Sequence, residues 1–191
     1  MLLGLSVLAG ALLGLFMASL PAPSDTRTFW IGNFSAPWAV LAFAAGWSQR
    51  SRPWSAMGAA AGEVAIVVGF YGSGLVGEFA DPERLLGLEP YPGPLPFIET
   101  ALGGWLGLAG PWMVLALAAG VVYGLLGRWW RESRAIAAGV AIALPFLVEP
   151  LAWRVYDGFL KGPLAVWAVE IAAGIALLSW VLLARRRLAS R

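Results

Sequence analysis

The residues of this chain best suited to chemistry are glutamates inside long apolar stretches. Glu63 follows Trp54 by nine residues, which at about 1.5 Å per helical residue places it near the middle of a membrane. Glu149 and Glu170 lie closer to the outer ends of the last two stretches. A carboxylate at the centre of a bilayer costs roughly 2.5–3.5 kcal/mol on insertion scales, so it is expected to face the interior of a helix bundle. Glutamates in such positions bind cations or relay protons.

The surroundings of Glu63 indicate a neutral carboxyl group. No arginine or lysine is expected at its depth, so the group is expected to be protonated and hydrogen-bonded to Tyr71, Tyr123 or a backbone carbonyl. A structural glutamate and a functional one fit this position equally well. For the other two glutamates a structural ion pair is favoured, because the outer loop carries Arg154 and Lys161.

The second apolar stretch is interrupted by polar residues, among them Asn33. Pro37 suits the first turn of a helix, and a helix from there to Gln49 would span roughly 20 Å, less than the hydrocarbon core. A non-helical segment over Asn33–Ala36 would then be buried in protein or line water, although a tilted helix running unbroken from residue 30 fits equally well. Four tryptophans lie deeper than the aromatic belt that explains most of the others, and they could line a cavity: Trp38, Trp105, Trp112 and Trp167. The candidate ligand-binding or proton-relay residues are therefore Glu63, Glu149, Glu170, Asn33, Trp38, Tyr71 and Trp167.

Two residue types are missing from the chain, cysteine and histidine. Their absence excludes disulfides, thiol nucleophiles, Cys/His zinc sites, a haem axial histidine and a Ser-His-Asp triad. The sequence also has no phosphate-binding loop and no nucleophile–base pair. We therefore expect no enzymatic activity, no cofactor and no metal site.

The composition is that of an integral membrane protein. Of 191 residues, 60% are hydrophobic and 13% charged, and the mean hydropathy is +0.76, whereas about a quarter of a soluble domain is charged. A partner that needs a broad basic surface, such as a nucleic acid, is excluded. At roughly 20 residues per spanning helix, the chain predicts an all-α, polytopic bundle of about six spans in a single domain, 1–191. The spans are expected near residues 2–20, 30–47, 54–77, 97–126, 135–151 and 163–184.

Arginines are concentrated in alternate segments. Loop 49–53 carries two, loop 127–134 three and the tail 185–191 four of the 13 basic residues. Because cytoplasmic loops are enriched in such residues, both termini are expected in the cytoplasm, and the acidic, proline-rich loop 78–96 outside, as an extended linker or a lid. The first stretch lacks the basic start of a signal peptide, so it is expected to stay in the protein. The sequence predicts a multi-pass protein of the cell membrane, such as a bacterial inner membrane.

The first stretch carries small residues at helical spacing: Ser6, Gly10, Gly14 and Ala18. Small residues four apart let two helix backbones approach closely. This packing face is expected to meet another helix of the same chain, with a partner membrane subunit as the alternative.

Two segments of the chain resemble each other. Residues 36–46 and 110–120 are identical at eight of eleven positions, including a shared Pro-Trp pair. The match fits a duplicated hairpin, as in some transporters, but alanine-rich helices also match by chance.

The segment 32–43, which reads Gly-Asn-Phe-Ser-Ala-Pro-Trp-Ala-Val-Leu-Ala-Phe, resembles part of an uncharacterised, mostly actinobacterial family of small membrane proteins, domain of unknown function 6518. Segments 148–151 and 167–171 resemble the glutamate-bearing final helices of that family. The chain departs from the family pattern at Phe34, which displaces a serine, and at Pro37, which replaces a small residue. The resemblance implies a compact multi-span membrane protein and no particular activity.

Two functions fit these features. The first is a small-solute binding or transport component with an outward-facing acidic and aromatic cavity, in which the glutamates bind a cationic group or relay a proton. The alternative is an accessory or structural subunit of a larger membrane complex, docked through the small-residue face of the first helix. The expected partners are thus the lipid bilayer, a small-molecule ligand and a membrane subunit.

Overall fold

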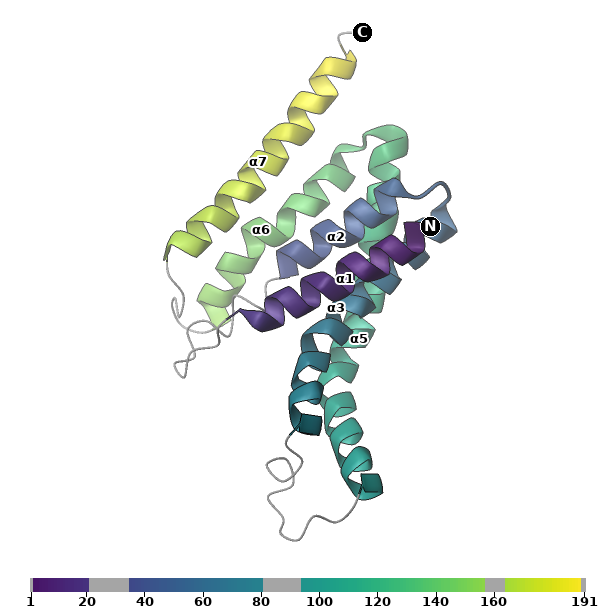
Figure 1. The fold of residues 1–191 in the computed structure, drawn as a ribbon. Coiled ribbons are helices and arrows are strands. Elements are labelled where there is room, and N and C mark those ends of the chain that lie inside the picture. The colour runs from purple at the N-terminus through teal and green to yellow at the C-terminus, as the bar shows by residue number, and fades with distance from the viewer. Residues whose placement is uncertain (1, 21–34, 81–93, 157–163, 190–191) are drawn as a thin grey trace.

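The fold is entirely helical in the part of the chain that the computed structural model describes, residues 2–20, 35–80, 94–156 and 164–189. These residues contain six helices and no strand (Figure 1). The helices are α1 Leu2–Ser19, α2 Ser35–Ser48, α3 Arg52–Ala80, α5 Pro94–Ser133, α6 Ile136–Tyr156 and α7 Leu164–Ala189. Each overlaps one predicted apolar stretch, which confirms the all-α prediction.

Four of the six helices, α1, α3, α5 and α7, are long and apolar enough to cross a membrane. The other two fall short. α2 has 14 residues, or about 21 Å, and the apolar part of α6 is confined to Ile136–Ala152. A count of six spans therefore stays a prediction, although the start of α2 at Ser35 agrees with the short helix expected after the polar interruption.

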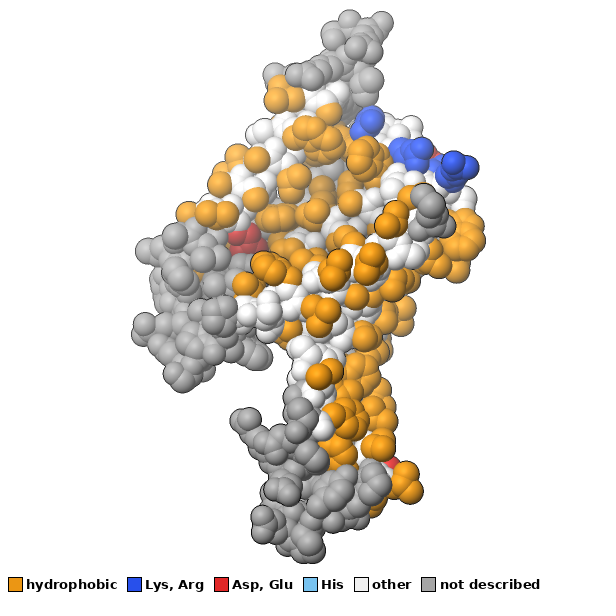
Figure 2. All heavy atoms as spheres, viewed as in Figure 1, with side chains coloured by type: hydrophobic (Ala, Val, Ile, Leu, Met, Phe, Trp, Pro, Cys, Tyr) orange, Lys and Arg blue, Asp and Glu red, His pale blue; other side chains and the backbone are white. Residues whose placement is uncertain are grey.

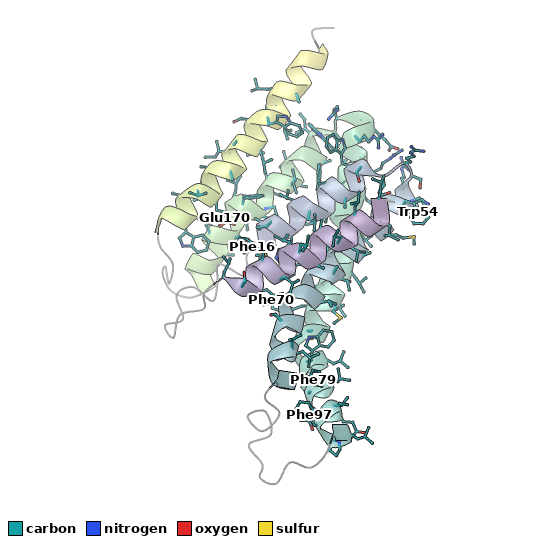
Figure 3. All side chains as sticks on the ribbon, in the orientation of Figure 1. Phe16, Trp54, Phe70, Phe79, Phe97 and Glu170 are labelled. Atoms are coloured by element: carbon teal, nitrogen blue, oxygen red, sulfur yellow. The ribbon has the colours of Figure 1, made fainter. Side chains whose placement is uncertain are left out.

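Helices α3 and α5 are longer than the sequence predicted. They have 29 and 40 residues, or about 44 and 60 Å, and they run side by side beyond the other helices (Figure 1). At their far end the rings of Phe79 and Phe97 meet edge to face, with centroids 5.3 Å apart (Figure 3). The predicted loop 78–96 is thus helical at both ends, because the first turn of a helix tolerates prolines such as Pro94 and Pro96; residues 81–93 lie outside the described part.

The small-residue face of α1 lies against α3. Ser6, Gly10 and Gly14 are buried, and a methyl group on either glycine would collide with a backbone carbonyl of α3, at Gly62 or Ile66. Ala18 is only half-buried. The opposite face of α1 exposes leucines and Phe16, as suits a lipid-facing surface. The seam is therefore occupied within the chain.

A second seam joins α2 and α5, and α3 packs against both helices. Gly46 contacts the backbone of Gly124, and Gly120 contacts that of Ala60. Small residues again allow the backbones to touch. The two resembling segments 36–46 and 110–120 therefore lie on neighbouring helices that run in the same direction.

The remaining helices, α6 and α7, form a hairpin at one side (Figure 1). α7 packs along α6, and the ring of Trp180 reaches that of Trp130 on α5 at 5.4 Å. α6 has much less contact with α2 and α5 than it has with α7. This loose attachment leaves space between α6 and the other helices.

Arginine side chains gather at one end of the bundle (Figure 2). There Arg128 and Arg131 donate hydrogen bonds of 2.7 and 2.9 Å to the carbonyl oxygen of Gln49, directly after α2. Arg134, in the left-handed region at φ 51°, makes the turn into α6. The start of α1 and the end of α7 lie toward the same end (Figure 1). The alternation predicted from the arginines agrees with this arrangement, and the cytoplasmic location of this end stays a prediction.

Candidate functional site

A cavity of about 330 Å³ lies between α2, α3, α5 and α6. Its walls are mostly apolar. Four aromatic side chains and one carboxyl group carry its distinctive chemistry: Trp38, Tyr71, Trp112, Tyr123 and Glu63. The loose contact between α6 and the rest of the bundle creates this space, because the small residues of α2 and α5 draw those helices together and leave α6 apart.

Glu63 is the buried polar group of this cavity. Its side chain is 2% exposed, and Oε1 has no hydrogen-bond partner among the described residues. The hydrogen bond expected with Tyr71, Tyr123 or a backbone carbonyl is not formed at this atom. Tyr71 lies eight residues further along α3, about 12 Å away along the helix axis. Glu63 is thus buried with one acceptor unused.

The two resembling segments each contribute a tryptophan to the cavity, Trp38 and Trp112. Trp38 of α2 donates its Nε1–H to Met17 Sδ of α1, at 3.1 Å, which fixes the orientation of its ring. Trp112 of α5 occupies the equivalent position of the other segment and is 49% exposed. Trp38 is therefore fixed by a contact inside the bundle, whereas Trp112 belongs both to the cavity wall and to the outer surface.

Glu149 binds the start of α2. The side chains of Arg154 and Lys161, expected to form an ion pair with it, lie outside the described residues. The Glu149 carboxylate accepts hydrogen bonds from the backbone N–H of Ser35 at 3.0 Å, the hydroxyl of Ser35 at 2.8 Å and the N–H of Ala36 at 3.2 Å. A helix N-terminus offers unpaired N–H donors and a partial positive charge, so it suits a carboxylate. Because Ser35 also lines the cavity, Glu149 holds the residue at its edge.

Glu170, which is labelled on α7 in Figure 3, interacts with Glu149 of α6. It is 6% exposed, and neither carboxyl oxygen has a well-formed hydrogen bond to a described residue. The two carboxyl groups interact electrostatically.

The structure thus brings together some of the candidate residues and separates others. Glu63, Trp38 and Tyr71 line one cavity, with Glu149 at its edge and Glu170 behind Glu149. Trp167 is buried on α7 and does not line this cavity, and Asn33 lies outside the described residues. Trp112, one of the four deep tryptophans expected to line a cavity, does line it. Ser35 was not among the candidate ligand-binding residues, although it belongs to the polar interruption of the second stretch.

The chemistry available here is that of isolated carboxyl groups among aromatic rings. In the described part of the chain, no group of three His, Cys, Asp or Glu side chains could hold a metal ion.

A scan against models of known protein families, a search of the curated proteins and a search of the solved structures found no match to this chain. The resemblance to domain of unknown function 6518 stays a prediction.

Proposed function

We propose that this chain is a membrane component that binds or transports a small molecule, and that the molecule occupies the cavity at Glu63. One observation carries the proposal: a fully buried carboxyl group with an unused oxygen borders a cavity of about 330 Å³. Ligand sites of proteins are typically mostly apolar cavities of roughly 300–1,000 Å³ with few polar groups. The cavity has that character.

A purely structural Glu63 would be expected to have a partner for each oxygen. An unsatisfied buried polar group costs about 1–3 kcal/mol, whereas an apolar residue at this position would cost nothing of the kind. Glu149, by comparison, has three donors within 3.2 Å. The contrast between the two glutamates favours a role for Glu63 outside the folding of the chain.

The accessory-subunit alternative drew on the small-residue face of α1. That face contacts α3 through Gly10 and Gly14, so packing within the chain accounts for it. The described residues then offer more support for a ligand site than for a docking site.

Native mass spectrometry of the protein, extracted from its own membranes in mild detergent, tests the proposal. We expect a stoichiometric small-molecule adduct on the wild type and its loss in Glu63→Gln, which keeps the shape of the side chain. Glu99→Gln is the matched control, because Glu99 is an exposed glutamate on α5, and this variant should keep the adduct. An adduct at full occupancy in Glu63→Gln, or co-purifying polypeptides without any adduct, would contradict the proposal.

A further inference from the structure

The residues that line the cavity indicate which class of ligand it would bind. This inference rests on the proposed function, in which the cavity is the ligand site. The walls include two tryptophans and two tyrosines, and Glu63 is the acidic residue among the described lining residues. Aromatic faces attract cations, most strongly where water is excluded, and a carboxylate adds an opposite charge. Lysine and arginine are absent from the described residues of this lining, which therefore offers an anionic ligand no opposite charge. The composition favours a cation with an apolar body.

The cavity is accessible from the side of the bundle. Trp112 and Leu115 of α5 line it and are 49% and 58% exposed, so the same side chains face both the cavity and the surroundings. On α6, Leu144 and Val148 flank the lining residue Pro145 and are also exposed. These residues lie in helical segments whose exposed surface is apolar (Figure 2). In a membrane, this opening between α5 and α6 would face lipid.

The charge on Glu63 must change when a cation binds. In the empty cavity the group has no cation beside it, so its neutral form is favoured. The titratable groups that face it are Tyr71 of its own helix and Tyr123 of α5; α1 and α2, which also pack against α3, carry none. Glu149 of α6 lies at the cavity edge, bound to Ser35. A cation seated in the cavity would favour the carboxylate and release the proton.

We propose that the cavity takes up an amphiphilic organic cation from the bilayer in exchange for one proton of Glu63. The O–H bond of the carboxyl group breaks, its electron pair stays on the carboxylate, and the proton leaves to water. The ligand forms no covalent bond. The net charge inside the cavity is the same before and after the exchange, which spares the cost of an unpaired charge in the membrane.

A pair of probes with the same shape tests this inference: phenyltrimethylammonium and its neutral carbon analogue, tert-butylbenzene. Binding to the whole protein in lipid nanodiscs is measured by calorimetry in two buffers of different ionisation enthalpy, which counts the protons released, with empty nanodiscs subtracted. We expect the cation to bind with one proton released and its affinity to rise about tenfold per pH unit, from the mass action of one proton. Glu63→Gln should weaken it about tenfold or more and abolish the release.

Two variants in which phenylalanine replaces an alanine of α5 test whether the probes bind in this cavity, independently of which class of ligand it takes. Ala119→Phe fills the cavity, which Ala119 lines, and should weaken the probes. Ala118→Phe is the matched control on the exposed side of α5 and should change nothing. Equal binding of the neutral probe to the wild type, cation binding without proton release, or no binding of the cation would overturn the exchange. If the neutral probe alone binds and Ala119→Phe weakens it, the cavity remains a ligand site; if Ala119→Phe has no effect on any probe that binds, the proposed function fails as well.

Discussion

The close approach of α1 to α3 can be tested with two glycines of α1, because one contacts α3 and the other faces open space. A methyl group added at Gly10 would collide with the carbonyl oxygen of Gly62 and lie 3.2 Å from the Cβ of Ala65. A methyl group added at Gly4 would meet nothing within 4 Å. The variants Gly10→Ala and Gly4→Ala therefore make the same chemical change on one helix, and only the first disturbs a contact.

The size of the effect follows from the geometry. Non-bonded carbon atoms sit about 3.5–4.0 Å apart, so α1 would have to move away from α3 by roughly 1 Å to admit the methyl group at Gly10. Overpacking of this kind costs about 1–3 kcal/mol. The gain in helix propensity from glycine to alanine, about 1 kcal/mol, applies to both variants and largely cancels. Gly10→Ala should therefore be less stable than Gly4→Ala by about 1–3 kcal/mol.

Thermal unfolding in detergent, followed by tryptophan fluorescence, measures this difference. For a chain of this size, 1 kcal/mol corresponds to about 2–4 °C in Tm, so Gly10→Ala should melt about 2–12 °C below Gly4→Ala. Equal melting temperatures would refute the contact between α1 and α3 through this face. The small-residue face would then be free, and the accessory-subunit alternative would regain its support.

Three further predictions concern contacts that hold the site in place. Glu149→Gln removes the negative charge at the start of α2 and puts an amide N–H₂ where Oε1 accepts from the N–H of Ser35, and should cost about 1–3 kcal/mol in the same melting assay; wild-type stability would argue against the cap on α2. Replacing Arg128 and Arg131 together by alanine removes both side-chain donors to Gln49 and should cost about 1–2 kcal/mol, with incomplete recovery by lysine, which lacks the planar fork. Because the chain has no cysteine, Phe79→Cys and Phe97→Cys in one protein should be joined by a short bismaleimide; the absence of intramolecular cross-linking would contradict the pairing of α3 and α5 at that end.

The helices were largely predictable from the sequence, but their lengths were not. Hydropathy locates the part of a helix that suits lipid, and all six predicted stretches overlap helices for this reason. The helix itself continues wherever backbone hydrogen bonds are favourable. α5 runs on to Ser133 through Arg128 and Arg131, polar residues that are good helix formers and that bind the end of α2. Prolines marked residues 94–96 as loop, although the first helical turn accepts them.

The site was predictable in part. The depth of Glu63 along an apolar stretch identified it from the sequence alone, because ionisable residues inside a membrane are energetically costly and are therefore candidates for function. The partner of Glu149 could not be identified in the same way, since backbone N–H groups at the start of another helix leave no mark on side-chain patterns. The cavity itself depends on how four helices pack, and the exposure of Trp112 on its wall depends on where α6 stands.

The central claim is that Glu63 is a neutral carboxyl group in a cavity reachable from lipid, and carbodiimide labelling tests it most directly. A hydrophobic carbodiimide reacts with protonated carboxyl groups that it reaches through the bilayer, and peptide mass spectrometry locates the product. In intact membranes we expect Glu63 to be modified, and phenyltrimethylammonium to slow that modification. Glu132 should stay unmodified, because Arg128 and Arg52 hold its carboxylate at 2.8 and 3.4 Å. A Glu63 that stays unmodified in membranes and reacts only after the protein is unfolded would contradict the claim.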